Sequence, residues 1–222
     1  MEQPFKDVKL LIGIPSTGTW SGDMGLSFAL MVHMLTCYAV PFHIQQERGS
    51  ILPQLRQNLL DRAIKDGATH LLFIDSDQTF PHELGIRWLQ KDFPVVAANI
   101  ATKAFPSNPT ARQEGNRKVF SDAAADPFEK VWRVGTGLMM LKREAFVQLP
   151  RPAFEQRWRE ESGTFQGEDW TLCEHLEALG IPIRVDHALS LQVGHVGFET
   201  YTHDHVVLSR RMEAENGAIN VK

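Results

Sequence analysis

Short apolar runs alternate with amphipathic segments along the first half of this chain. Four runs have the length and composition of β-strands: Val8–Ile14, Pro41–Gln46, Thr69–Ile74 and Pro94–Ile100. The segments between them carry helical spacing or a helix start signal: Ser21–Val40, Ile51–Lys65 and His82–Gln90. This alternation predicts an α/β fold, with a mostly parallel central sheet and helices on both faces.

The alternation loosens in the second half. Residues Ala101–Asp126 are polar and contain two prolines, which predicts a loop or small excursion near a functional site. Further strands are expected at Val131–Val134, Leu138–Leu141, Ile183–Val185 and Leu189–Val193. Further helices are expected at Glu168–Leu179 and His203–Glu215. Without repeats or linkers, we expect one domain over residues 1–222, with a core at about 8–198 and a terminal helix or tail at 199–222.

Composition narrows the class of protein only slightly. The 222 residues can bury a substantial core, and the net charge of −4 provides no general attraction for nucleic acid or anionic membrane. Cys37 and Cys173 form no Cys-x-x-Cys pair, which favours a reducing compartment. The uncharged segment Met24–Gln46 has too short an apolar part to span a membrane. We therefore predict a cytoplasmic protein with no membrane span.

The strongest chemical signal is the pair of carboxylates that ends an apolar strand. Asp75 and Asp77 follow Thr69–Ile74, at the end of a strand where α/β sheets bind ligands. Two such charges are costly together unless a cation joins them, and hard divalent cations prefer oxygen ligands. The same residues could instead form a turn with an Asx cap.

Two loops rich in small residues could approach a ligand closely. Gly13–Gly18 has the glycine spacing of a P-loop but lacks its Lys and Ser/Thr, and no dinucleotide fingerprint follows the first strand. What remains is a polar turn at Pro15, Ser16 and Thr17, which could equally be an ordinary connection. Gly135, Thr136 and Gly137 interrupt a strand pattern, which indicates a bulge or a close approach to the backbone.

Other candidates need tertiary structure to support them. Arg56 and Asn58 lie on an amphipathic helix, where an arginine suits phosphate but more often faces solvent. Glu168 and Asp169 open a helix whose dipole should keep the carboxylates ionised, and they could be caps or catalytic groups. His195 lies between glycines after a strand, as a structural residue or a metal ligand. The histidines match no zinc framework.

The ordered set of motifs resembles the GT-A-fold glycosyltransferases, particularly small stand-alone family-two-like enzymes of bacteria and phages. The matching pieces, from about residue 8 to 198, are LIGIPST, LRQNLL, LLFIDSD, VGTGLMML, GEDWTLC and VGHVG. The resemblance implies a GT-A-like, Rossmann-like fold and a nucleotide-sugar donor, with a UDP-sugar as the first candidate. It also implies Asp75 and Asp77 as a DxD motif that holds Mn²⁺ or Mg²⁺ on the donor diphosphate.

The resemblance further implies the roles of the remaining residues. Donor-binding residues would be Pro15, Ser16, Thr17, Arg56, Asn58, Asp75, Ser76, Gly135, Thr136 and Gly137. Asp169, or else Glu168, would be the base that deprotonates the acceptor hydroxyl, and His195 a further metal ligand. Inversion at the sugar carbon is the favoured outcome. The acceptor could be a glycan, a protein or a modified nucleic acid.

Two other functions remain open. Asp75 to Thr79 also fits the nucleophile motif of haloacid-dehalogenase-type phosphatases, although that motif normally lies on the first strand. A non-catalytic nucleotide-sugar-binding module is the second alternative. The acidic pair Glu168 and Asp169 counts against it, because binding alone needs no base.

Overall fold

The computed structural model describes residues 4–123, 126–197 and 200–219. Its central sheet has seven strands in the order β2, β1, β3, β9, β5, β12, β8, and five of them run in one direction. Only β9 and β8 are antiparallel to their neighbours. The strands are β1 (Leu10–Ser16), β2 (Phe42–Arg48), β3 (His70–Ile74), β5 (Val95–Ala97), β8 (Phe128–Val131), β9 (Leu138–Lys142) and β12 (Ile183–Asp186). The predicted fold class, a mostly parallel α/β sheet, is confirmed.

The apolar runs of the strands supply two separate cores. Along β3, Leu71 and Phe73 point into one core, whereas Leu72 and Ile74 point into the other. Successive side chains of a strand alternate between faces, so a strand that is buried on both faces needs apolar residues at every position. This requirement explains why the inner strands β1, β3 and β9 are nearly continuous apolar runs, whereas the edge strands β2 and β8 are more polar.

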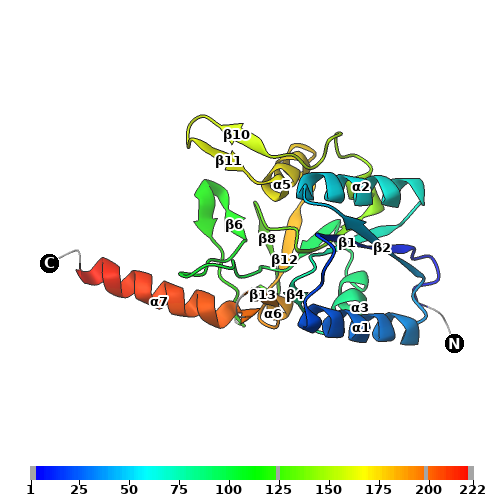
Figure 1. Cartoon of the computed structure of the whole chain (residues 1–222), viewed down its shortest axis with the longest axis horizontal. Coiled ribbons are helices and arrows are strands. Elements are labelled where there is room, and N and C mark those ends of the chain that lie inside the picture. The colour runs from blue at the N-terminus through cyan, green and yellow to red at the C-terminus, as the bar shows by residue number, and fades with distance from the viewer. Residues whose placement is uncertain (1–3, 124–125, 198–199, 220–222) are drawn as a thin grey trace.

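Helices cover both faces of the sheet (Figure 1). One face carries α1 (Gly22–Cys37), α3 (Leu84–Leu89) and α6 (His187–Ser190), and the other carries α2 (Leu52–Lys65), α4 (Arg143–Phe146) and α5 (Glu168–Ala178). Helix α1 begins after Ser21, whose hydroxyl accepts a hydrogen bond from the Met24 amide (3.1 Å), as a serine N-cap does.

The segment Met24–Gln46 does not form one long apolar element. It divides into α1, whose buried side chains recur at helical spacing, and β2. Within the described parts of the chain, no helix has the length and apolar content that a membrane crossing requires.

Two strand predictions in the second half need correction. Leu189–Val193 is not a strand, because Asp186 accepts a hydrogen bond from the Leu189 amide (3.1 Å) and caps the short helix α6. The predicted strand Val131–Val134 lies earlier, as β8. After Val131 the chain leaves the edge of the sheet, and the amides of Trp132 and Arg133 donate to the Arg112 carbonyl instead.

Three smaller sheets complete the fold. They are β10 (Arg157–Arg159) with β11 (Thr164–Gln166), β6 (Arg112–Gln113) with β7 (Arg117–Lys118), and β4 (Gln78–Thr79) with β13 (Gly194–Val196) and β14 (Thr200–Tyr201). A 3-10 turn, η1 (Glu114–Asn116), joins β6 to β7, and α7 (His203–Ile219) extends away from the sheet (Figure 1). The pairing of β13 with β4 places His195 opposite Gln78, next to Asp77. The predicted boundary between core and tail, at residues 198 and 199, lies outside the described residues, and so do residues 220–222 at the end of the tail.

Candidate active site

The carboxyl ends of β1 and β3 border a cavity of about 250 Å³. Seven residues singled out from the sequence line it: Pro15, Ser16, Thr17, Asp75, Ser76, Asp77 and His195. The polar turn after β1 is closed on itself, because Ser16 Oγ accepts from the Gly18 amide (2.9 Å) and donates to the Thr19 carbonyl (3.0 Å). The fold thus brings together three segments that are far apart in the chain.

Asp75 lies against α2 and the strand β9. Both of its carboxylate oxygens accept hydrogen bonds from Arg56 Nη2, each at 2.9 Å. Its amide donates to the Gly137 carbonyl (2.8 Å). A Cβ at Gly137 would lie 3.0 Å from both Asp75 Oδ2 and Ile100 Cδ1, which explains the need for a glycine there.

Asp77 is paired with two basic side chains. Its Oδ1 lies 3.5 Å from His195 Nε2, and its Oδ2 pairs with Lys103. Burial alone would raise the pKa of Asp77, but hydrogen bonds and charge from His195 and Lys103 lower it to about 2. Lys103 belongs to the polar segment after β5, which therefore does lie at this site, as the sequence predicted.

The ring of His195 is held in one orientation. Its Nδ1 lies 2.9 Å from the Ala101 carbonyl, which can only accept, so Nδ1 carries the proton and donates. This contact leaves Nε2 directed at the Asp77 carboxylate. A backbone carbonyl that fixes the tautomer in this way is typical of metal-ligating histidines.

Asp75, Asp77 and His195, the predicted metal ligands, all line this cavity. The described residues contain no group of three or more His, Cys, Asp or Glu side chains arranged to hold a metal. Mg²⁺ commonly takes only one or two carboxylates from the protein and completes its shell with phosphate oxygens and water. A metal here would therefore rely on the ligand for much of its coordination.

Arg56 is a buried link rather than a solvent-facing residue. Its side chain is 4% exposed, and it pairs with both Asp75 and Glu168. Burial would lower its pKa, but the charges of Asp75, Glu168 and Asp169 raise it overall. Asn58 lies elsewhere on α2, hydrogen-bonded to Gln54 (2.7 Å) and Glu47 (3.3 Å), and the structure does not bring it to the cavity.

Glu168 and Asp169 begin α5 but have different surroundings. Glu168 is buried against Arg56. Asp169 accepts a hydrogen bond from the Trp170 amide (2.7 Å), yet burial raises its pKa to about 6, with Glu168 and Asp75 adding to the rise. Burial of the carboxylate opposes the helix dipole, which favours the anion, and a carboxyl with this pKa is still largely ionised at neutral pH. A carboxylate with such a pKa is suited to general-base catalysis near neutral pH.

The loop Gly135–Gly137 meets the site only at its end. Gly137 contacts Asp75, whereas Gly135 packs near Thr110. Thr136 is buried, and its hydroxyl has no hydrogen-bond partner among the described residues. Of the three predicted residues in this loop, Gly137 is therefore the one in contact with the site.

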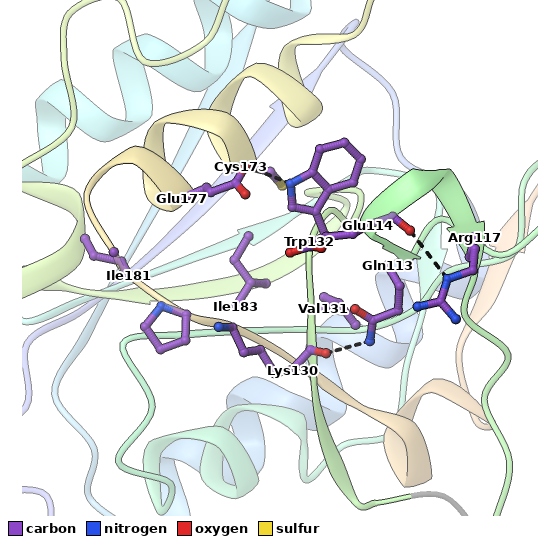
Figure 2. A pocket seen from close by; sticks show the side chains of 12 residues that line it. Gln113, Glu114, Arg117, Lys130, Val131, Trp132, Cys173, Glu177, Ile181 and Ile183 are labelled. Carbon is purple, nitrogen blue, oxygen red and sulfur yellow. Dashed lines mark hydrogen bonds between the residues drawn. The ribbon is translucent and has the colours of Figure 1, made fainter.

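A separate cavity of about 340 Å³ contains none of the predicted site residues (Figure 2). Its polar groups largely bond to one another: Trp132 Nε1 donates to Glu177 (2.7 Å), and Gln113 donates to the Lys130 carbonyl (2.8 Å). Cys173 lies at its wall, and burial raises the pKa of this thiol to about 12, so the nucleophilic thiolate is not formed.

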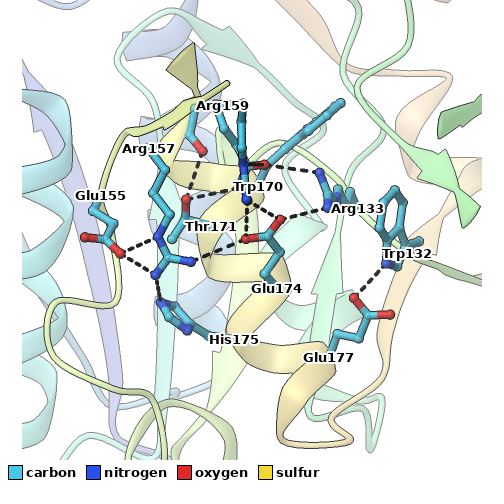
Figure 3. A network of polar contacts seen from close by, with 12 residues as sticks. Trp132, Arg133, Glu155, Arg157, Arg159, Trp170, Thr171, Glu174, His175 and Glu177 are labelled. Carbon is cyan, nitrogen blue, oxygen red and sulfur yellow. Dashed lines mark hydrogen bonds and ion pairs between the residues drawn. The ribbon is translucent and has the colours of Figure 1, made fainter. Parts of the chain in front are cut away.

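A network of charges beside α5 was not predicted from the sequence (Figure 3). Arg133, Arg157 and Arg159 all pair with one carboxylate, that of Glu174. Arg133 also stacks on Trp132 and Trp170, with its guanidinium carbon 3.7 and 4.8 Å from the ring centroids. The alternation of Arg157 and Arg159 along β10 was the only available clue.

Comparison with known proteins identifies the fold alone. No known family model matches the sequence, and no curated protein sequence does. A197 from STIV is similar in structure, with a TM-score of 0.62 and 18% identity over 89% of this chain and 92% of that one. A glycosyltransferase involved in the glycosylation of the major capsid of PBCV-1 has a TM-score of 0.38 and 9% identity over 62% of each chain, a likeness too low to carry an argument.

Proposed function

We propose that this protein is a glycosyltransferase that moves a sugar from a nucleoside-diphosphate sugar to an acceptor hydroxyl. The observation that supports this best is the cavity in which Pro15, Ser16 and Thr17 from one strand end meet Asp75 and Asp77 from the next. Strand ends of an α/β sheet are where such ligands bind. A UDP-sugar is the first candidate donor.

In this proposal, one group of residues binds the donor diphosphate and another residue deprotonates the acceptor. Asp75, Asp77 and His195 would hold Mn²⁺ or Mg²⁺, which when bound neutralises charge on the departing diphosphate. Arg56 holds the Asp75 carboxylate in place beside Gly137. Asp169, whose pKa is raised to about 6, accepts the proton of the acceptor hydroxyl, so that attack occurs with inversion at the sugar carbon.

The geometry favours this function over a haloacid-dehalogenase-type phosphatase. In that class the motif normally lies on the first strand, whereas here it follows β3. Both oxygens of Asp75 also accept hydrogen bonds from the Arg56 guanidinium, which makes them weaker nucleophiles.

The test is calorimetric titration with UDP in the presence of Mn²⁺ and, separately, of excess chelator. We expect Mn²⁺-dependent binding that is lost in Asp75→Asn and Asp77→Asn but retained in Asp61→Asn. Asp61 is the matched control, a carboxylate on α2 that pairs with Arg151. Equal binding with chelator present would refute the metal role. Release of phosphate from an aryl phosphate would instead support the phosphatase function. Donor binding without hydrolysis or transfer would support a non-catalytic binding module.

A further inference from the structure

The β10–β11 hairpin and the start of α5 enclose a second cavity, of about 310 Å³. It is distinct from the cavity at Asp75 and Asp77, since the two share no lining residue. Asp169 lines it and is the residue that connects it to the proposed chemistry. Arg56 joins the two regions, because it pairs with Asp75 on one side and with Glu168, next to Asp169, on the other.

The lining of this cavity combines hydroxyl, amide and aromatic groups. Ser162 Oγ and Thr164 Oγ1 lie 2.8 Å apart on the hairpin, and Gln166 and Trp170 lie deeper. Groups that both donate and accept, next to a flat aromatic ring, complement a sugar ring, which has hydroxyls at its rim and C–H groups on its faces.

The charges around the cavity argue against a polyanionic ligand. Arg159 is its cationic lining residue, and Glu174 already accepts hydrogen bonds from it at 2.6 and 2.8 Å. Arg157 and Arg133 pair with the same glutamate (Figure 3). The hairpin turn adds Glu160 and Glu161 next to the lining residue Ser162, and the whole chain has a net charge of −4. The three arginines are outnumbered by the nearby carboxylates, which are Glu155, Glu160, Glu161, Asp169 and Glu174. Nucleic acids bind surfaces with uncompensated positive charge, which this cavity therefore does not offer.

We propose that this cavity binds the acceptor and that the acceptor is a neutral saccharide. This inference rests on the proposed function and decides between the acceptor classes that the sequence left open. The acceptor oxygen forms a bond to the anomeric carbon of the donor, and the bond from that carbon to the diphosphate oxygen breaks. The hydroxyl proton passes to Asp169, and the electron pair leaves with the nucleoside diphosphate, so the step needs no further reactant.

The experiment measures binding without donor, by saturation-transfer NMR and calorimetry on the full chain. The probes are four neutral trisaccharides (cellotriose, maltotriose, mannotriose and chitotriose), a 20-base-pair DNA duplex and a Ser/Thr-rich hexapeptide. We expect at least one trisaccharide to bind and the DNA and the peptide not to bind. Absence of binding by all four trisaccharides, or binding of DNA or peptide at this cavity, overturns the inference.

Two variants that fill the cavity locate the binding. Thr164→Phe, and independently Ser162→Phe, should each weaken trisaccharide binding at least tenfold. Thr36→Phe is the matched control and should change it less than twofold, because Thr36 is exposed on α1, which packs on the other face of the sheet. Unchanged affinity in both filled variants overturns the inference, provided circular dichroism shows that they fold.

Binding of UDP, measured in the same samples, separates this inference from the proposed function. If trisaccharides bind and UDP does not, the saccharide site is supported and the proposed nucleotide-sugar donor is refuted. If UDP binds and no trisaccharide does, the proposed donor is supported and the saccharide acceptor is refuted.

Discussion

Asp77 and Asp169 line different cavities and have opposite environments. Asp77 has a pKa of about 2, because contacts with His195 and Lys103 outweigh its burial. Asp169 has a pKa of about 6, because burial outweighs the attraction of Arg56. Carboxylates whose pKa values are pushed apart in this way commonly have different catalytic tasks. Asp77 is suited to stay charged and bind a cation, and Asp169 to exchange a proton.

The largest expected effect is on turnover. Asp169→Asn should lower it by about 10²-fold or more, since general-base catalysis contributes about 10² to 10⁴. The affinity for UDP and Mn²⁺ should be little changed. In the wild type, kcat/KM should rise as the pH increases through about 6, where the Asp169 carboxyl loses its proton. The variant should lack this rise.

Two carboxylates on the same helix serve as controls for Asp169. Glu177→Gln alters a residue that accepts a hydrogen bond from Trp132 outside the site, and its turnover should be normal. Glu168→Gln should retain more turnover than Asp169→Asn. If Glu168→Gln is inactive and Asp169→Asn is not, the roles of the two residues are reversed.

The next largest effect is the loss of stability expected when Arg56, which pairs with both Asp75 and Glu168, is replaced. Arg56→Met leaves Glu168 and Asp75 without their partner, and breaking a buried ion pair typically costs about 3–5 kcal/mol. We expect a loss of that order in the free energy of unfolding, measured by urea denaturation. Arg62→Met is the control, since its pair with Asp66 is surface-exposed and should contribute less than about 1 kcal/mol. Equal losses in both variants would contradict the role of Arg56.

The effect of His195 should be confined to the Asp77 side. His195→Ala should weaken Mn²⁺ binding by about 10- to 100-fold, the usual range for loss of a group that supports a metal site. Calorimetry with UDP present measures this. His205→Ala is a control, because His205 is bonded to Thr202 away from the cavity. An unchanged Mn²⁺ affinity in His195→Ala would make His195 structural.

The smallest effects are opposite changes in stability. The depressed pKa of Asp77 contributes stability above pH 4 that is lost as the pH falls toward 2, up to about 2 kcal/mol. The raised pKa of Asp169 acts in the other direction, since stability falls as the pH rises from about 4 to about 6. At pH 7, Asp77→Asn should therefore destabilise the fold and Asp169→Asn stabilise it. Shifts of the same sign in thermal denaturation would show that the two environments do not differ as described.

Local patterns were sufficient to predict most of the sheet. The runs at β1, β3 and β5 and the positions of Asp75 and Asp77 at the end of β3 follow from apolar content and spacing, which depend on neighbouring residues in the chain. The run at Leu189–Val193 failed for a local reason as well, because a short apolar run does not distinguish a strand from a capped turn of helix.

The tertiary structure decided which of these residues act together. Arg56 and Glu168 are 112 positions apart, and their contact turns a residue expected at the surface into a buried link. The same packing raises the pKa of Asp169, brings Lys103 to Asp77 and gives three arginines to Glu174. Desolvation and ion pairing depend on neighbours in space, and no periodicity along the chain encodes them.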